Sequence, residues 1–279
     1  LKLFAAARRS TPAMPERSRS PAARAPRVAD AALTGKVAVV TGGAGGIGSA
    51  IALSLVRQGA IVVITGRRLE ALEATSKRIG EATQGQGPGR VVTVSSDVSE
   101  EGSVEALFAT VEELCGACDI LINNAGISSG GPTVSISAEL FSKVMGVNVL
   151  GPFLCAREAF KQMIKHGGGR IINVGSIAAE TPRPNAAPYT ASKFALQGLT
   201  RSLALDGRPH NIAVGVIHPG NVPSDILTPE EIERRRATEG FISAEDVAAC
   251  VLQMAVLPLT ANVLEMTVMP TKQPLVGRG

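Results

Sequence analysis

The stretch KVAVVTGGAGGIGSAIALSLVRQ, residues 36–58, decides the fold. It begins with an apolar run typical of a buried β-strand and ends with apolar residues at helical spacing. Between them, residues 41–48 contain five glycines. Glycines at the first strand-to-helix turn let backbone N–H groups approach a pyrophosphate at the helix N-terminus. The stretch therefore predicts a dinucleotide-binding turn, with a purely structural turn as the weaker alternative.

The glycines fit two registers. Gly43, Gly45 and Gly48 match G-x-G-x-x-G, whereas Gly42, Gly46 and Gly48 match G-x-x-x-G-x-G. Both registers predict the same contact between backbone and phosphate. The sequence alone leaves the choice between them open.

Six more β-rich runs follow the first, and helical segments separate most of them. Unbroken Val, Ile and Leu runs are typical of strands covered on both faces, as in a parallel sheet. We therefore predict an α/β fold: a Rossmann-like, doubly wound, mostly parallel seven-stranded sheet with helices on both faces, in a single domain over residues 33–279. The six runs are IVVIT from Ile61, VVTVS from Val91, DILIN from Asp119, RIINVGS from Arg170, NIAVGVIHP from Asn211 and NVLEMTVM from Asn262.

The formal net charge of +4 comes from residues 1–32, which carry seven basic and two acidic side chains. The rest of the chain has a net charge of −1, so it offers no electrostatic case for nucleic-acid binding. No run of about 18 apolar residues predicts a membrane span. We expect a soluble protein without nucleic-acid or membrane partners.

Residues 1–32 are rich in Ala, Arg, Ser and Pro, which predicts a disordered basic leader. This composition resembles an organelle transit peptide. The alternatives are an over-extended reading frame, with Met14 as another start, and an unstructured leader. The predicted location is accordingly the cytoplasm, or a mitochondrion or plastid if the leader is a targeting segment.

The second strand ends in Thr65-Gly66-Arg67-Arg68, without an acid that could bind the 2′-hydroxyl of NAD. Glu70 comes too late and is expected in the next helix. Arg67 and Arg68 could neutralise a 2′-phosphate, which favours NADP(H) over NAD(H). The alternative is that both are solvated surface arginines.

Tyr189 is the only tyrosine of the chain, and Lys193 follows it by one helical turn. A nearby ammonium stabilises a phenolate, so such a pair can exchange a proton. Ser176, at the end of an earlier strand, could hydrogen-bond a substrate oxygen that gains negative charge. On spacing alone, a packing tyrosine and a turn serine remain alternatives.

Together these motifs resemble the short-chain dehydrogenase/reductase family over residues 35 to about 270. The cofactor-binding positions of the family match Thr41, Gly42, Gly43, Gly46, Ile47, Gly48, Asp97, Val98, Asn124, Ala125, Gly126, Pro219, Gly220 and Val222. Its catalytic positions match Asn148, Ser176, Tyr189 and Lys193, the last two of which also contact the cofactor.

The resemblance implies hydride transfer between a nicotinamide cofactor and a small carbonyl or alcohol substrate. It implies that Tyr189 is the general acid and base, that Ser176 holds the substrate oxygen, and that Asn148 keeps a relay water. It also implies a homodimer or homotetramer formed through residues 138–165 and 188–206. The alternative is a catalytically silent nucleotide-binding regulator of the same fold.

The chain departs from the family at Ser224, where a threonine is usual, and in its C-terminal residues, which are similar to those of reductases of 3-hydroxy acids and aldehydes. Substrate specificity is expected between Val222 and Ser243 and between Ala178 and Pro188. Arg183 and residues 234–236 could meet an anionic substrate or simply be solvated.

The remaining candidate groups predict no further chemistry. Cys115 and Cys118 fall at the end of a helix, which favours a structural role over redox chemistry. The three histidines, His166, His210 and His218, have no metal-ligand spacing, so no metal is predicted.

Overall fold

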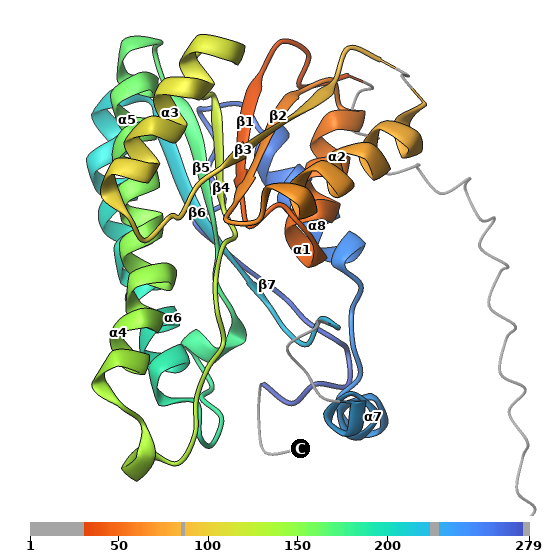
Figure 1. The fold of residues 1–279 in the computed structure, drawn as a ribbon, viewed down its shortest axis with the longest axis vertical. Helices are drawn as coiled ribbons and strands as arrows, with labels where there is room; N and C mark the ends of the chain where they lie inside the picture. Colours follow the sequence, from red (N-terminus) through yellow and green to blue (C-terminus); the bar gives the residue numbers. More distant parts are fainter. Residues whose placement is uncertain (1–30, 85–86, 224–228, 276–279) are drawn as a thin grey trace, which may run out of the picture.

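A computed structural model describes residues 31–84, 87–223 and 229–275 (Figure 1). The predicted leader and Ser224 lie outside the described residues, apart from Ala31 and Ala32 of the leader.

One seven-stranded sheet forms the centre of the domain, in the order β3-β2-β1-β4-β5-β6-β7. Every neighbouring pair of strands is parallel, so the predicted mostly parallel sheet is parallel throughout the described residues. All seven predicted runs form strands: β1 Val37–Thr41, β2 Ile61–Gly66, β3 Arg90–Ser95, β4 Ile120–Asn123, β5 Gly169–Val174, β6 Ile212–Pro219 and β7 Glu265–Val268.

Helices cover both faces of the sheet, as Figure 1 shows. One face carries α1 (Gly46–Arg57), α2 (Leu69–Thr83) and α8 (Ala244–Val256). The other carries α3 (Glu101–Cys115), α4 (Ala138–Met145), α5 (Gly151–Lys165) and α6 (Ala187–Gly207). The short helix α7 (Pro229–Thr238) lies apart from both layers, beyond the lower ends of the strands in Figure 1.

The alternation of side chains along the strands builds two separate cores. Ala38 and Val40 of β1 pack with residues of α1 and α8, whereas Val37 and Val39 pack with α3 and α5. Because both faces of the strand are buried, both sets must be apolar. This burial explains the unbroken apolar runs in the sequence.

Helices α4 and α5 are joined by a π-helical turn, η2 (Gly146–Leu150), into one continuous helix of 28 residues. By length and composition this helix could cross a membrane. Its residues Leu154, Cys155, Ala159 and Met163 are instead buried in the core beneath the sheet. One face of this helix therefore belongs to the core of the domain.

Two local features concern the ends of helices. Ser243 caps α8 in a capping box with Asp246, since each side chain bonds the other residue's backbone N–H at 2.9–3.0 Å. Cys118 is buried, and burial raises the pKa of its thiol well above the usual value. A buried, protonated thiol is a poor nucleophile, which supports the structural interpretation of this pair.

Candidate active site

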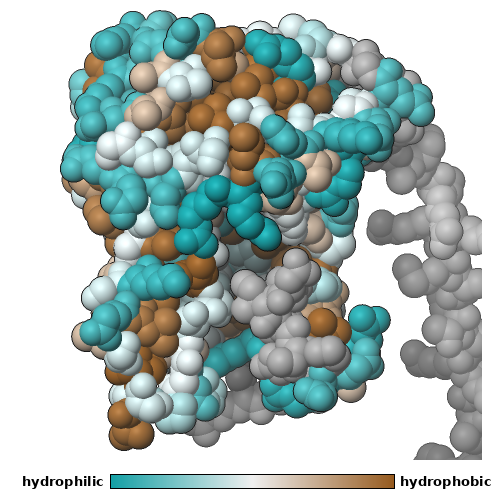
Figure 2. Space-filling view, viewed as in Figure 1, coloured by the Kyte–Doolittle hydropathy of each residue, from teal (hydrophilic) through white to brown (hydrophobic). Residues whose placement is uncertain are grey.

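The candidate site lies at the carboxyl ends of β1, β4, β5 and β6, where the strand order reverses between β1 and β4. Ligands of doubly wound sheets bind at such a switch point. A cavity of about 330 Å³ opens there, and Figure 2 shows the surface hollowed between the parts that carry α4 and α7. Its lining includes Gly42, Gly46, Ile47, Asn124, Ala125, Gly126, Ser176, Tyr189, Lys193, Pro219, Gly220 and Val222.

The glycine loop connects β1 to α1 along this cavity. Gly42 and Gly46 have positive φ values of 65° and 52°, a region that side chains disfavour. A side chain on Gly48 would overlap the carbonyl oxygen of Gly42, because the helix packs directly on the loop. The backbone therefore selects the register Gly42, Gly46 and Gly48.

Asn124 connects the glycine loop to the end of β4 through hydrogen bonds. Its side-chain nitrogen donates to the carbonyl oxygens of Thr41 at 2.9 Å and Gly42 at 3.1 Å. The hydroxyl of Thr41 in turn accepts the backbone N–H groups of Asn124 and Ala125, both at 3.0 Å. These reciprocal bonds explain why Thr41, which does not line the cavity, matters to its shape.

The N-terminus of α1 faces the cavity without a side-chain cap. Gly45 is the cap residue and makes no side-chain hydrogen bond, and no acidic residue lies in the first turn of the helix. The free N–H groups and the positive end of the helix dipole therefore point to where an anion would bind. Together with the close-packed glycines, they fit the pyrophosphate of a dinucleotide.

The residues expected at the adenosine end lie beside this cavity and not in its lining. Arg67 and Arg68 follow β2 and are exposed, and Glu70 lies in the first turn of α2, as predicted. Burial raises the pKa of Asp97, but hydrogen bonds from Ser99 and the charge of Arg67 outweigh it and hold this pKa below its usual value. Val98 is buried in the core cluster that α3 and α5 also form.

Tyr189 and Lys193 lie on the first turns of α6, which begins at Ala187 with Pro188 at its start. The Lys193 Nζ atom is 5.5 Å from the centre of the Tyr189 ring. It donates to the carbonyl oxygen of Val174 at the end of β5, at 2.9 Å. Lys193 is therefore held between the phenol and the sheet, and only 6% of the residue is exposed.

Ser176 follows β5 and faces the same cavity. Its hydroxyl oxygen accepts the backbone N–H of Ala178 at 3.1 Å, so it also begins a 3₁₀ turn. Ser176 therefore begins the 3₁₀ turn and also lines the cavity. Its backbone contacts the ring of His218, a buried histidine of β6.

Asn148 lies in η2 and is buried, with its amide directed at the β4–α4 connection. Its oxygen accepts the N–H of Ile127 and its nitrogen donates to the carbonyl oxygen of Ile127, both at 2.9 Å. The nitrogen also lies 2.9 Å from the hydroxyl of Ser192, which donates to the carbonyl oxygen of Tyr189 at 2.7 Å. Asn148 therefore links the cavity wall to α6, and a π turn at a functional site is a common arrangement.

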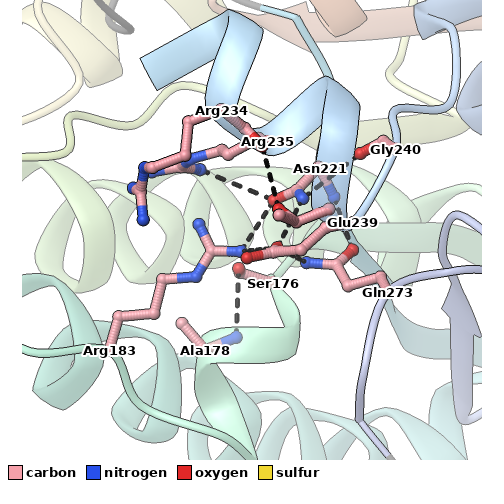
Figure 3. A network of polar contacts seen from close by, with 10 residues as sticks. Ser176, Ala178, Arg183, Asn221, Arg234, Arg235, Glu239, Gly240 and Gln273 are labelled. Carbon is pink, nitrogen blue, oxygen red and sulfur yellow. Dashed lines mark hydrogen bonds and ion pairs between the residues drawn. The ribbon is translucent and has the colours of Figure 1, made fainter. Parts of the chain in front are cut away.

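Above Ser176, a polar network joins the two segments expected to set substrate specificity (Figure 3). Arg183 donates through one nitrogen to Asn221 at 2.7 Å and to Glu239 at 2.9 Å. Asn221 also donates to Glu239 at 2.8 Å, and its backbone N–H is held by Gln273 at 2.9 Å. Arg183, for which the sequence left open a role as a ligand for an anionic substrate, is paired with a carboxylate of its own chain.

The cavity brings together most of the predicted site and leaves some residues outside. Four predicted residues lie behind the cavity walls: Thr41, Gly43, Gly48 and Asn148. Four others lie beyond the edge of the cavity: Arg67, Arg68, Asp97 and Val98. Sequence reasoning missed Ile127 and Ser128 in the lining, which no motif marks, and it assigned Ser192 and His218 no role in the site. Among the described residues, no three His, Cys, Asp or Glu side chains gather as a metal site.

A parallel α/β fold with a glycine-rich turn and a Ser, Tyr and Lys set in one cavity defines a nucleotide-dependent oxidoreductase class. Residues 36–235 match the family described as short chain dehydrogenase. The chain belongs to the short-chain dehydrogenase/reductase family.

Similar proteins include a short-chain type dehydrogenase/reductase of Picea abies, 37% identical over 80% of this chain and 86% of that protein. A gluconate 5-dehydrogenase of Gluconobacter oxydans is 36% identical over 75% of this chain and 78% of its own length. Among solved structures, an actinorhodin polyketide ketoreductase variant with NADPH has a TM-score of 0.77 and 31% identity, covering 84% of this chain and 96% of its own. A metagenomic short-chain oxidoreductase with NADP has a TM-score of 0.73 and 33% identity, covering 86% and 99%.

Proposed function

We propose that this protein transfers a hydride between NADP(H) and a small carbonyl or alcohol substrate, with Tyr189 as the general acid and base. The observation that carries the proposal is that Ser176, Tyr189 and Lys193 line the same cavity as the glycine loop. A nucleotide held at that loop would share the cavity with these three side chains. The bound cofactor would supply or accept the hydride.

The protein's own groups would handle the proton and the developing charge. In carbonyl reduction, the Tyr189 hydroxyl gives its proton to the substrate oxygen while the carbon receives the hydride; in alcohol oxidation the proton returns. The ammonium of Lys193 stabilises the resulting phenolate, since opposite charges nearby favour the ionised form. The hydroxyl of Ser176 donates to the substrate oxygen and holds it in place.

Three groups would bind the cofactor's phosphates. The N-terminus of α1 and the backbone of Gly42 to Gly48 fit the pyrophosphate. Arg67 and Arg68 are exposed next to the end of β2, where a 2′-phosphate would be expected. These two arginines, with no carboxylate at the strand tip, favour NADP(H) over NAD(H).

An apolar surface supports a dimer or tetramer. Phe141, Leu150 and Phe153, on α4 to α5, are 40–45% exposed. Leu150 and Phe153, together with Leu199 of α6, line a shallow apolar depression of about 500 Å³, and Phe141 lies next to one of its lining residues in the sequence. Figure 2 shows apolar residues over α4. Burying such a patch against a second copy would remove it from water. Its position falls in the two predicted contact regions.

The test is consumption of NADPH, followed by its absorbance, with a panel of aldehydes, ketones and β-keto acids. We expect turnover with at least one class, and we expect Tyr189→Phe to abolish nearly all of it while still binding NADPH. Because Tyr189 is the only tyrosine, this substitution removes every phenol of the chain. Substantial residual activity in the variant would refute the assignment. Absence of turnover on the whole panel, with NADPH still bound, would favour a silent nucleotide-binding regulator.

A further inference from the structure

His218 is a fully buried histidine next to the proposed substrate-binding serine. None of its surface is exposed, and its Nδ1 atom lies 3.2 Å from the backbone nitrogen of Ser176 and 2.9 Å from the backbone oxygen. The proposed reaction uses neither nitrogen of this ring.

The hydrogen-bonded pairing of β5 with β6 ends next to His218. The last backbone bond joins the N–H of Gly175 to the carbonyl oxygen of Ile217 at 2.7 Å. Pro219, two residues further along β6, has no N–H to continue the ladder. Beyond it, the His218 ring and not a strand contacts the backbone of Ser176, whose carbonyl oxygen also accepts the N–H of Ala179 at 3.0 Å. Gly175 leaves room for it, because a Cβ there would lie 2.5 Å from Nδ1.

The other ring nitrogen, Nε2, points to a carboxylate held by α6. Within residues 31–84, 87–223 and 229–275, Nε2 has no hydrogen-bond partner, and the Oε1 atom of Glu265 is 3.6 Å away. Glu265 itself accepts hydrogen bonds from Gln197 at 2.9 Å and Arg201 at 3.1 Å. These contacts fix Glu265 to the helix that carries Tyr189 and Lys193.

The carboxylate selects the form of the neutral ring. A neutral imidazole has one donor and one acceptor nitrogen. A proton on Nε2 faces the negative charge of Glu265 favourably, whereas a lone pair there would be repelled. With the proton on Nε2, the bare Nδ1 accepts the N–H of Ser176 at 3.2 Å, while its lone pair is repelled by the carbonyl oxygen of Ser176 at 2.9 Å. When the ring gains a second proton, Nδ1 becomes a donor and faces the carbonyl oxygen of Ser176 instead.

We infer that His218 is a positioning residue. Its neutral ring, oriented by Glu265, accepts the N–H of Ser176. Protonation of the ring exchanges this contact for one to the Ser176 carbonyl oxygen and so shifts the Ser176 hydroxyl. This inference rests on the proposed role of Ser176 in binding the substrate oxygen. It adds a residue that acts through Ser176 without touching the substrate.

The surroundings determine when the exchange occurs. Burial lowers the pKa of His218 below the ordinary value of 6.5, aided by the positive charge of Lys193 on α6. The Ser176 carbonyl oxygen, Glu265 of β7 and Glu180 after the 3₁₀ turn oppose this effect, and Arg201 offsets part of the Glu265 charge. The ring is therefore neutral at pH 7. As the pH falls through its lowered pKa, the Ser176 contact changes and turnover should decrease.

Two substitutions separate positioning from mere packing. His218→Leu removes the ring nitrogens, and we expect kcat to fall about tenfold or more while the Kd for NADPH changes less than about twofold. In His218→Asn, the amide can occupy the position of Nδ1 but cannot titrate. We expect it to recover kcat to within about fivefold and to lose the acidic limb of the kcat/KM profile. His210→Leu, at an exposed histidine, is the matched control and should leave both quantities unchanged.

A measurement without turnover tests the ring directly. The ¹⁵N shifts of the His218 ring at pH 7.5 should show the neutral form with its proton on Nε2; the spectrum of His218→Asn identifies its signals among the three histidines. A proton on Nδ1 would contradict the inference. If His218→Leu does not fold, Glu265→Gln is tested in its place. The acidic limb of its kcat/KM profile should move to lower pH, because the negative charge that stabilises the protonated His218 ring is gone.

The outcomes distinguish this inference from the proposed function. If Tyr189→Phe keeps its activity, the proposed function fails. If Tyr189→Phe is inactive while His218→Leu keeps kcat within about twofold, or if Asn rescues no better than Leu, only the role of His218 is refuted.

Discussion

The Nζ atom of Lys193 lies 5.5 Å from the centre of the Tyr189 ring and 2.9 Å from the carbonyl oxygen of Val174. The ammonium is buried, and the carbonyl oxygen gives it a fixed partner that compensates in part for lost water. Its position beside the phenol is therefore set by β5 and not by the flexible stem of the lysine.

Replacing this ammonium should impair the proton transfer. We expect Lys193→Met to lower kcat by about 100-fold or more, because no charge remains to stabilise the phenolate. Lys77→Met, at an exposed lysine of α2, is the control and should keep its activity. Steady-state kinetics with NADPH measure both. A Lys193→Met enzyme with kcat near that of the wild type would show that the pair does not act together.

The choice of cofactor should depend on the arginines after β2. We expect Arg67→Ala combined with Arg68→Ala to raise the KM for NADPH by about 10- to 100-fold, because about 1–3 kcal/mol of charge-assisted bonding to the 2′-phosphate is lost. The KM for NADH should change little. Arg57→Ala, at an exposed arginine on the opposite end of α1, serves as the control. An equal rise for both cofactors would argue against recognition of the 2′-phosphate.

The tight contact between the glycine loop and α1 predicts different effects for two Gly→Ala substitutions. At Gly48 the new methyl group would overlap the carbonyl oxygen of Gly42, so we expect a loss of stability of about 1–3 kcal/mol and weaker NADPH binding. At Gly102 in α3, nothing lies within 4 Å, and alanine should stabilise the helix by about 0.5–1 kcal/mol. Urea denaturation distinguishes them; similar free energies of unfolding for the two variants would contradict the packing described.

The buried amide of Asn148 should contribute to both stability and activity. Asn148→Ala leaves the N–H and carbonyl oxygen of Ile127 without their partners, so we expect the free energy of unfolding to fall by about 1–3 kcal/mol. Turnover should fall as well, because the link through Ser192 to Tyr189 is lost. Urea denaturation and kinetics measure the two effects. Unchanged stability would mean that water replaces the amide at no cost.

The pairing of Arg183 with Glu239 leads to a prediction about substrates. If Arg183 mainly joins the two loops, Arg183→Ala should change the KM for acidic and neutral substrates by the same factor. If it binds a substrate carboxylate, only the acidic substrates should be affected. Measuring the KM for a β-keto acid and for its ester decides between the two roles. A selective effect of about tenfold or more would restore the ligand hypothesis.

Much of the fold could be predicted because its signals are local. Each predicted strand formed, since residues such as Val37 to Val40 must be apolar on both faces when helices cover both sides of the sheet. The cap of α8 at Ser243 and the start of α6 near Pro188 are likewise local features, because each depends on residues within one turn. The register of the glycines was open in the sequence, because it depends on φ values and on the contact of Gly48 with Gly42.

The sequence by itself determined the order of strands and helices along the chain, the glycine-rich turn before α1 and the presence of Ser176, Tyr189 and Lys193 at positions where strands end or helices begin. Only the tertiary structure decided which distant side chains support them. Asn148 meets Ile127, His218 meets Ser176 and Arg183 meets Glu239 across 21, 42 and 56 residues. Hydrophobic period and turn chemistry report on neighbours along the chain, whereas these polar contacts depend on how separate loops converge at one edge of the sheet.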